Sequence, residues 1–283
     1  MQTIIGLGQA GCNIADKFSQ YSQYTVYKID AGLKKKSYHR ALKRHEHPEQ
    51  YEENCPNLKQ FLKGAGENVL FITSCGNVSG TSLRILEQIK NKCKISILYI
   101  KPDLSFLSDN KILQNNLLFN VFQEYSRSGV FERVYIVDNL QLADIVGDVP
   151  VREYYNKLNE IIVSTMHMIN VFNNSESVMD TFSPSLEVAR ISTLGLVELE
   201  DGEEKSFFSL DMPRKKRYYY AIPEDVLKSD GKFIKKISKQ LKENMEHDRM
   251  KIDYGVYATN YEQPYVYFVA DSSMIQKNLD KGK

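Results

Sequence analysis

The sequence has few cysteines, no excess of charge of either sign and no long apolar run. Its four cysteines contain no CxxC pair and are accompanied by only five histidines, so neither a zinc site nor a disulfide framework is expected. Lys plus Arg total 37 and Asp plus Glu total 36, which argues against a nucleic-acid coat or a basic membrane-surface protein. No apolar stretch approaches the ~18 residues of a spanning helix, and no charged leader precedes the first apolar segment. We therefore expect a chain without a membrane segment, in a reducing compartment.

What the sequence does contain is an alternation of apolar strand-like runs and helical patterns. Its 283 residues suit one large domain or two ordinary ones at ~100–200 residues each, and 42% hydrophobic residues are typical of a globular chain. The expected strands are Thr3–Gly6, Tyr24–Ile29, Val69–Thr73, Ile95–Ile100 and Val134–Val137. The expected helices between them are Cys12–Tyr21, Ser82–Lys92 and Ile112–Tyr125. This order predicts an α/β fold with a parallel, Rossmann-like sheet.

The alternation of strands and helices ends after residue 150. A long amphipathic helix is expected at 151–172, because Pro150 suits a helix start, and a polar loop follows at 173–184. The remaining elements predict a smaller α+β domain. They are strands at 190–199 and 206–210, a basic amphipathic helix at 231–246, and a strand pair, 250–259 and 265–271, joined by residues 260–264.

The first chemical signal is a glycine motif of GxGxxG type at Gly6, Gly8 and Gly11, between a strand and a helix. Such glycines let the backbone approach a phosphate, and a helix N-terminus favours an anion. Asp30 ends the second strand, 19 residues after Gly11, where a dinucleotide fold places its ribose-binding acid. The motif fits an NAD(P)-dependent enzyme, or a tight turn that binds nothing.

A second loop of similar character, residues 74–82, again follows a strand and opens a helix. It carries Gly76 and Gly80 among the hydroxyl residues Ser79, Thr81 and Ser82. Two anion-binding loops on one sheet edge suit a nucleoside triphosphate better than a dinucleotide, which needs one. A third small-residue stretch, 63–66, precedes the same strand, and we expect it on the same edge, closing over a terminal phosphate.

The third signal is the segment 137–144 with the start of the long helix. Asn139 follows a strand, and an Asn side chain offers both a donor and an acceptor to a purine edge. Tyr155 can stack on a base, and Asn159 lies on the same helix face four residues on. Taken singly, Asn139 is equally consistent with a helix cap and Tyr155 with a core residue.

Together these residues resemble the tubulin/FtsZ superfamily of GTPases, in order along nearly the whole chain. The segments that resemble it are GLGQAGCNIAD, KGAG (63–66), GNVSGTS (76–82), IKPDLSF (100–106), VDN with YNKLNEII, and the C-terminal IDYGVYATNYEQPYVYFVADSS. The nucleotide-binding residues that the resemblance implies are Gly8, Gln9, Ala10, Gly11, Asn13, Asp30, Ala65, Gly66, Gly76, Asn77, Val78, Ser79, Gly80, Thr81, Ser82, Asn139, Tyr155 and Asn159.

The resemblance further implies GTP or GDP as the bound nucleotide, with Mg²⁺, and copies of the chain itself as partners in a head-to-tail filament. It implies three parts: a GTP-binding domain at 1–150, a central connecting helix at 151–177 and a C-terminal activation domain at 178–283. Family members are cytoskeletal, so we expect a cytoplasmic protein, of a cell or of an infected host cell. Nucleic acid is not expected as a partner, and no adaptor or cargo can be named.

The family's loop after the central helix carries acids that polarise the attacking water. One alignment puts Asp180 and Ser183 at these positions, and another puts Ser183 and Leu186 there with Glu187 nearby. Asp180 is our first candidate for the catalytic acid and Glu187 the second. We expect assembly-stimulated GTP hydrolysis; a filament protein that binds nucleotide with little or no hydrolysis and an NAD(P)-dependent enzyme stay open. The basic and aromatic run PRKKRYYY (213–220) is interpreted as a solvated loop or strand end rather than as a nucleic-acid patch.

Overall fold

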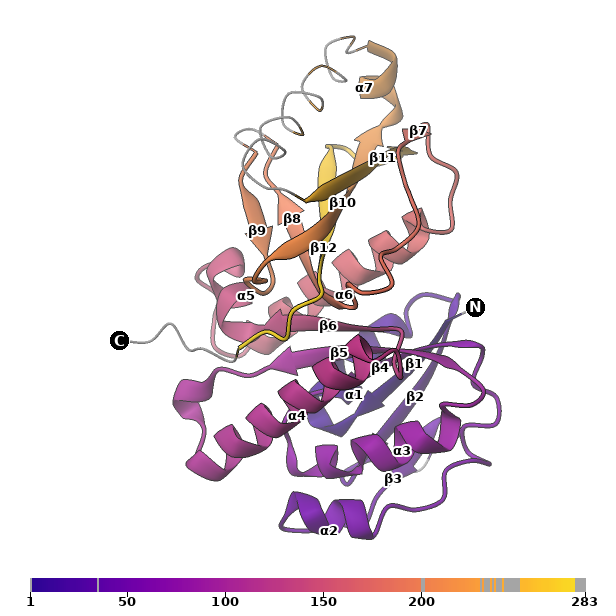
Figure 1. Ribbon diagram of the computed structural model, residues 1–283, viewed down its shortest axis with the longest axis vertical. Coiled ribbons are helices and arrows are strands. Elements are labelled where there is room, and N and C mark those ends of the chain that lie inside the picture. The colour runs from indigo at the N-terminus through magenta and orange to yellow at the C-terminus, as the bar shows by residue number, and fades with distance from the viewer. Residues whose placement is uncertain are drawn as a thin grey trace. The chain divides into compact units, whose positions relative to one another are not determined.

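The structure is a computed structural model that describes residues 2–34, 36–199, 202–229, 231, 235, 237, 241 and 250–277 (Figure 1). The chain divides into two compact units. Unit 1 comprises residues 1–163 and the segment from Ile275 onward, and unit 2 comprises residues 164–274. The predicted mixed α/β fold with a parallel sheet is confirmed.

The described residues of unit 1 form a parallel sheet in the order β3-β2-β1-β4-β5-β6. Its strands are β1 (Gln2–Leu7), β2 (Tyr24–Asp30), β3 (His39–Ala41), β4 (Asn68–Thr73), β5 (Lys94–Lys101) and β6 (Arg133–Asp138). All five expected strands are present. The edge strand β3 was not expected, because its three residues are short of apolar side chains.

The helices of unit 1 are α1 (Gly8–Phe18), α2 (Pro48–Glu53), η1 (Asn77–Thr81), α3 (Ser82–Ile89), η2 (Leu104–Phe106), α4 (Asp109–Arg127), α5 (Asn139–Val146) and the first part of α6 (Tyr154–Phe172). Of these, α1, α3, α4 and α6 correspond to expected helices, with bounds shifted by up to four residues, and no bounds were predicted for the other four. From β1 the chain moves to β2 on one side of the sheet's middle, whereas from β4 it moves to β5 and then β6 on the other side. Because β-α-β crossovers are right-handed, α1 covers one face of the sheet, and α3 and α4 cover the other.

Close packing explains why α1 begins so near the end of β1. A Cβ atom at Gly11 would lie 2.3 Å from the carbonyl oxygen of Ile72, and one at Gly6 would lie 2.4 Å from that of Gly11. Two glycines of the motif are therefore required by helix–strand packing alone. Gly8 differs, since its φ of +71° is the left-handed conformation that glycine tolerates.

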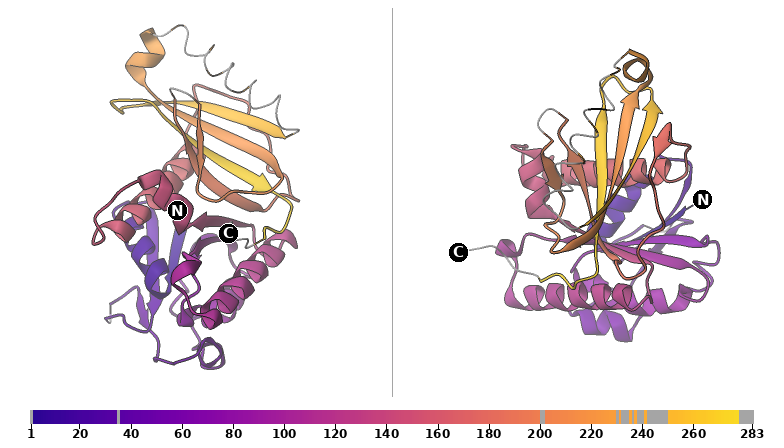
Figure 2. Two further views of the ribbon diagram at one scale, coloured as in Figure 1. Left: turned by 90° about the vertical axis from the view of Figure 1, so that its left-hand side faces the viewer. Right: turned by 45° about the horizontal axis from the view of Figure 1, so that its top comes forward.

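Unit 2 is built on a mixed sheet in the order β9-β8-β12-β10-β11-β7 (Figure 2). The strands are β7 (Met179–Asp180), β8 (Ile191–Val197), β9 (Glu204–Ser206), β10 (Pro213–Pro223), β11 (Lys251–Thr259) and β12 (Tyr265–Ser272), with helix α7 at Glu224–Ser229. β10 is antiparallel to β12 and parallel to β11. Both expected strands, β11 and β12, are present, but the prediction that they pair with each other is wrong, because β10 lies between them.

The basic run begins a strand, as the strand-end alternative had it, but the expectation that it is solvated is wrong. Residues 213–217 begin the long strand β10, and Lys215 is fully buried. Lys216 and Arg217 each have a carboxylate partner, Glu204 at 2.6 Å and Asp271 at 3.2 Å. Most of the expected basic helix at 231–246 lies outside the described residues. Two of its residues that are described, Ile237 and Leu241, are buried against the sheet.

Tyrosine fills both faces of β10. Tyr218 and Tyr220 lie in the cluster that includes Phe268, whereas Tyr219 is stacked near Phe172 of α6 on the opposite face. All three tyrosines are fully buried, which follows from the alternation of side chains along a strand covered on both faces. No helix in the described part of the chain has the length and hydropathy needed to cross a membrane.

Candidate functional site

The strand order of unit 1 marks one position as the expected ligand site. β1 and β4 are neighbours, but the chain continues from them to opposite sides, so their carboxyl ends form a topological switch point. Ligands of open α/β sheets bind in the crevice at such a point. The two segments that leave these strands are the start of α1 and the loop 74–82, which the sequence analysis had singled out. The structure thus brings these two predicted loops together.

The start of α1 offers backbone amides to a ligand. Leu7 is its N-cap, so the N–H groups of Gly8, Gln9 and Ala10 precede the first hydrogen bond of the helix, and its first turn has no acidic residue. A Cβ atom at Gly8 would have no neighbour closer than 3.9 Å. Unlike Gly6 and Gly11, Gly8 thus has room for a Cβ atom, which would be in ordinary contact with Val78 of the loop 74–82, and its backbone is not covered by close packing.

The loop 74–82 forms a second cradle, meaning a set of donors that could surround an anion, as the start of α1 does. Its hydroxyl groups, which the sequence suggested as the donors, have other partners. The side chains of Ser79 and Thr81 donate to the carbonyl oxygens of Gly76 and Val78, inside the loop, and both residues are buried with Ser82. The first hydrogen bond of η1 runs from Ser79 N to Gly76 O at 2.9 Å, which leaves the amides of Asn77 and Val78 ahead of it. The loop therefore offers backbone N–H groups rather than hydroxyl groups.

Two glycines of this loop differ in their surroundings. A Cβ atom at Gly76 would meet nothing within 4 Å, whereas one at Gly80 would lie 2.0 Å from the carbonyl oxygen of Pro48. Gly80 is therefore needed for packing against α2, and Gly76 leaves space at the cradle.

Helix α4 holds the loop from its other side. Gln114 Nε2 donates to Gly76 O and to Ser79 Oγ, both at 3.0 Å. Lys111, one turn earlier, donates from Nζ to Asn77 Oδ1, and Asn77 Nδ2 donates to Glu46 O at 2.6 Å. Lys111, Gln114 and Glu46 were not among the residues expected at the site. The i, i+3 spacing of a cation and an amide on one helix face is the only signal that could have found the first two.

Lys111 is a cation without a counter-charge. It forms no ion pair within the described residues, whereas Lys101, at the carboxyl end of β5, lies 2.8 Å from Oδ2 of Asp138. The other oxygen of Asp138 accepts from Leu140 N and caps α5, so Asn139 is the first residue of that helix and is half-buried. At the carboxyl edge of the sheet, the ammonium group of Lys111 is therefore a positive charge beside the loop 74–82.

The predicted base-reading residues lie at the start of α6 and α5. Tyr155 is 66% exposed, which excludes a core role, and its ring packs edge-on against Tyr154 at 5.1 Å. Asn159 is half-buried, and the adjacent Glu160 pairs with Lys17 of α1 at 3.3 Å, which fixes this part of α6 on α1.

Two further predicted residues lie along the same half of the sheet. Asn13 is exposed on α1, and Asp30 ends β2, where its Oδ1 accepts from Ala31 N at 2.7 Å. Cys12 of the motif is not a reactive thiol, because burial, reinforced by Asp30, raises its pKa to about 12.

The third predicted loop lies elsewhere. Ala65 and Gly66 immediately precede β4, and Gly66 N donates to Thr3 Oγ1 near the start of β1 at 2.9 Å. Both residues therefore lie at the amino ends of these parallel strands, opposite the switch point. The expectation of three such loops on one sheet edge is wrong for this one, and the loop after β3, which contributes Glu46, occupies the position next to Asn77 instead.

The two candidate acids belong to unit 2. Asp180 lies in β7 and is exposed; its Oδ1 accepts from Phe182 N at 3.2 Å and its Oδ2 accepts from Ser177 Oγ. Glu187 is exposed, and its main-chain oxygen accepts a hydrogen bond from Arg190 Nε at 2.8 Å. Ser183, which takes an acid position in both alignments, is hydrogen-bonded to Asp253 and Lys215.

The comparisons with known proteins agree with this arrangement at the level of the fold. No protein-family model matches the chain, and no curated protein matches its sequence. Among solved structures, the GTPγS-form protofilament of TubZ from Bacillus thuringiensis serovar israelensis is similar at a TM-score of 0.75 and 18% identity, with 97% of this chain and 88% of that chain covered.

Two other solved structures cover the chain as completely. An FtsZ dimer from M. jannaschii matches at a TM-score of 0.70 and 12% identity, covering 96% of this chain and 88% of that one. The GDP-bound monomer of CetZ1 from Haloferax volcanii matches at a TM-score of 0.69 and 16% identity, covering 96% and 94%. The chain therefore has the fold of the tubulin/FtsZ superfamily.

Proposed function

We propose that the chain binds a guanine nucleotide at the switch point of unit 1 and assembles head to tail into filaments, with GTP hydrolysis where two copies meet. One observation carries this proposal: two backbone amide cradles and an uncompensated lysine meet at the ligand-binding edge of a fold shared with FtsZ, TubZ and CetZ. The TubZ match is a GTPγS-form protofilament, and the CetZ1 match is a GDP-bound monomer.

The donor set fits a polyphosphate. The donors at the two loops would be the amides of Gly8 to Ala10, those of Asn77 and Val78, and Lys111 Nζ. Such donors would hold phosphate oxygens and spread their negative charge, which is most of what phosphoryl transfer asks of a protein. A bound Mg²⁺ would add charge neutralisation at the terminal phosphates.

The base would be read by amide side chains. Asn139 and Asn159 each present a donor and an acceptor, which guanine's edge requires together, and the exposed ring of Tyr155 is free to stack. Asp30 would accept a hydrogen bond from a ribose hydroxyl. These roles follow the resemblance residue by residue.

Exposed apolar side chains support assembly with copies of the chain. In unit 1, Phe106 is 86% exposed in the segment after β5, and Val151 is 91% exposed between α5 and α6. In unit 2, Val178 and Val188 are exposed on either side of the candidate acids. Large apolar residues at both proposed contact regions are what a repeating interface would bury.

Hydrolysis would depend on Asp180, supplied by the next copy. Its carboxylate is exposed and already oriented by two hydrogen bonds, so it can accept a proton or a hydrogen bond from an attacking water. A filament protein that hydrolyses little is the second candidate, because Ser183 stands where the family has a second acid and its hydroxyl is already engaged.

The test is GTP turnover against protein concentration, with sedimentation in parallel. We expect binding of GTP, pelleting with GTP and turnover that rises more steeply than protein concentration. Pelleting without phosphate release would establish the second candidate. Binding of NADH in place of GTP would overturn the proposal, since the strand order of unit 1 is equally that of dinucleotide-binding folds. Asp180→Ala should abolish turnover and retain GTP binding, with Glu187→Ala as the matched variant.

A further inference from the structure

A fully buried ion pair lies beside the loop that carries Asp180. Lys215 Nζ is 2.7 Å from Asp253 Oδ2, and the side chains are 0% and 3% exposed. Lys215 lies at the start of β10 and Asp253 near the start of β11, on adjacent parallel strands. Burying two charges costs several kcal/mol before their attraction is counted, so a pair of this kind persists only with further hydrogen bonds.

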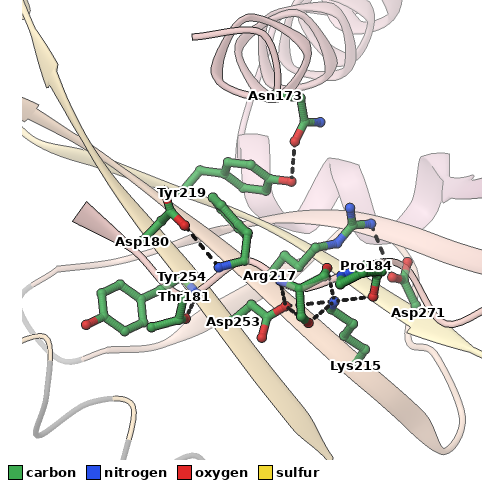
Figure 3. Close-up of polar contacts among 12 residues, drawn as sticks. Asn173, Asp180, Thr181, Pro184, Lys215, Arg217, Tyr219, Asp253, Tyr254 and Asp271 are labelled. Atoms are coloured by element: carbon green, nitrogen blue, oxygen red, sulfur yellow. Dashed lines mark hydrogen bonds and ion pairs between the residues drawn. The ribbon is translucent and has the colours of Figure 1, made fainter. Parts of the chain in front are cut away.

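Those further hydrogen bonds all go to one place, residues Ser183 and Pro184. Lys215 Nζ donates to Ser183 O and Ser183 Oγ at 2.9 Å and to Pro184 O at 3.1 Å. Asp253 Oδ2 accepts from Ser183 N at 2.9 Å and from Ser183 Oγ at 2.6 Å. Figure 3 shows Lys215 and Asp253 pointing toward each other beside Pro184. Every polar group of Ser183 is thereby held.

The loop is anchored on the other side of Asp180 as well. Val178 N donates to Val256 O at 2.7 Å, and Thr181 N donates to Tyr254 O at 2.9 Å, so the segment is bonded to β11. The ring of Phe182 lies over Gly255, where a Cβ atom would approach it to 2.5 Å. Asp180 is therefore an exposed carboxylate between two fixed points.

We infer that Lys215 and Asp253 are positioning residues that hold residues 177–184 in the shape that presents Asp180 to a second copy of the chain. The inference rests on the proposed function, in which that copy carries the nucleotide. A buried ion pair adds little net stability compared with apolar residues of similar volume. What this pair adds here is five hydrogen bonds that fix the backbone three residues from the candidate acid.

The test replaces the pair by apolar residues in the double variant Lys215→Met with Asp253→Leu, which leaves no unpaired buried charge. The control is Lys216→Met with Glu204→Gln, a lysine–carboxylate pair on the opposite face of β10. Hydrogen exchange over 177–187 should become about tenfold faster or more in the first variant, the factor for losing roughly one net hydrogen bond, and should not change in the control. A cooperative thermal transition in both would show that unit 2 still folds.

The functional readout separates positioning from general damage. GTP affinity should equal that of the unaltered chain, because the nucleotide residues belong to unit 1, while assembly-dependent phosphate release should fall about tenfold or more. Unchanged exchange in the loop, or faster exchange with normal turnover, would overturn the inference. Failure of the unaltered chain to bind GTP would instead overturn the proposed function, and exchange would still decide whether this pair fixes the loop.

Discussion

The ammonium group of Lys101 and the carboxylate of Asp138 lie 2.8 Å apart, and each side chain is only 5% exposed. The pair joins the carboxyl ends of β5 and β6, one residue before Asn139. Because Asp138 also caps α5, the position of Asn139 depends on this side chain being held in place.

Lys101→Met should therefore destabilise the chain by ~3–5 kcal/mol, because Asp138 would be left as an unpaired buried charge. Urea denaturation measures this directly. Lys17→Met removes a lysine from the more exposed pair with Glu160 and should cost no more than ~1 kcal/mol. If Lys101→Met and Lys17→Met were equally stable, Asp138 would have to be solvated in the first variant, and the buried pair would not have the expected effect.

Substitution by alanine should distinguish the glycines that are needed for packing from those that leave room for a ligand. Gly11→Ala should lower the stability by several kcal/mol, roughly the cost of overpacking or more, since its Cβ would lie 2.3 Å from Ile72 O. Gly76→Ala should leave the melting temperature within a few degrees of its original value and weaken nucleotide binding, because the methyl group would enter the open cradle. Normal affinity in Gly76→Ala would place the phosphates elsewhere.

Lys111 should contribute to affinity rather than to stability. Lys111→Met should weaken GTP binding by ~1.5–3 kcal/mol, the range for a hydrogen bond to a charged group, and should reduce the dependence of binding on salt. Lys90→Met on α3 is the control, because that lysine is exposed at a helix end. Titration with GTP at two salt concentrations measures both effects, and identical curves for the two variants would remove Lys111 from the site.

Burial of His167 on α6 predicts a pH dependence of stability. Burial lowers the pKa of this imidazole below its usual value near 6.5, so the folded chain keeps it neutral while the unfolded chain takes up a proton. The free energy of unfolding should therefore fall as the pH drops below about 6.5, until the lowered pKa of the folded form is reached. His167→Gln should flatten this part of the curve in urea titrations between pH 7 and 5; a curve of unchanged slope would assign the effect to other groups.

The sequence predicted the parallel sheet of unit 1 well, because its strands are short apolar runs and its loops carry local glycine signals. It misplaced Ala65 and Gly66, since composition does not tell which end of a strand a loop adjoins. It also misread residues 213–217, where polar side chains suggested solvent. Lys215 and Asp253 are 38 residues apart in the chain, so no local pattern shows that they neutralise each other inside a sheet.

The pairing of β10 between β11 and β12 was missed for a related reason. Tyr218, Tyr219 and Tyr220 show no alternation of polar and apolar residues, because the strand is covered on both faces and each ring is buried. The hydroxyl groups of Ser79 and Thr81 illustrate the same limit in the candidate site. Their residue type suggested donors to a ligand, but only the three-dimensional structure shows that they bond inside their own loop.

The buried tyrosines of β10 also give the chain a useful optical property. The sequence contains 18 tyrosines and no tryptophan, so its ultraviolet emission is that of phenol rings alone. A tryptophan in place of Phe182, whose ring centroid is 5.3 Å from that of Tyr219, would be the sole indole and would receive excitation energy from these neighbours. Its emission would then report on the loop beside Asp180 in real time, without any attached dye, as copies of the chain come together.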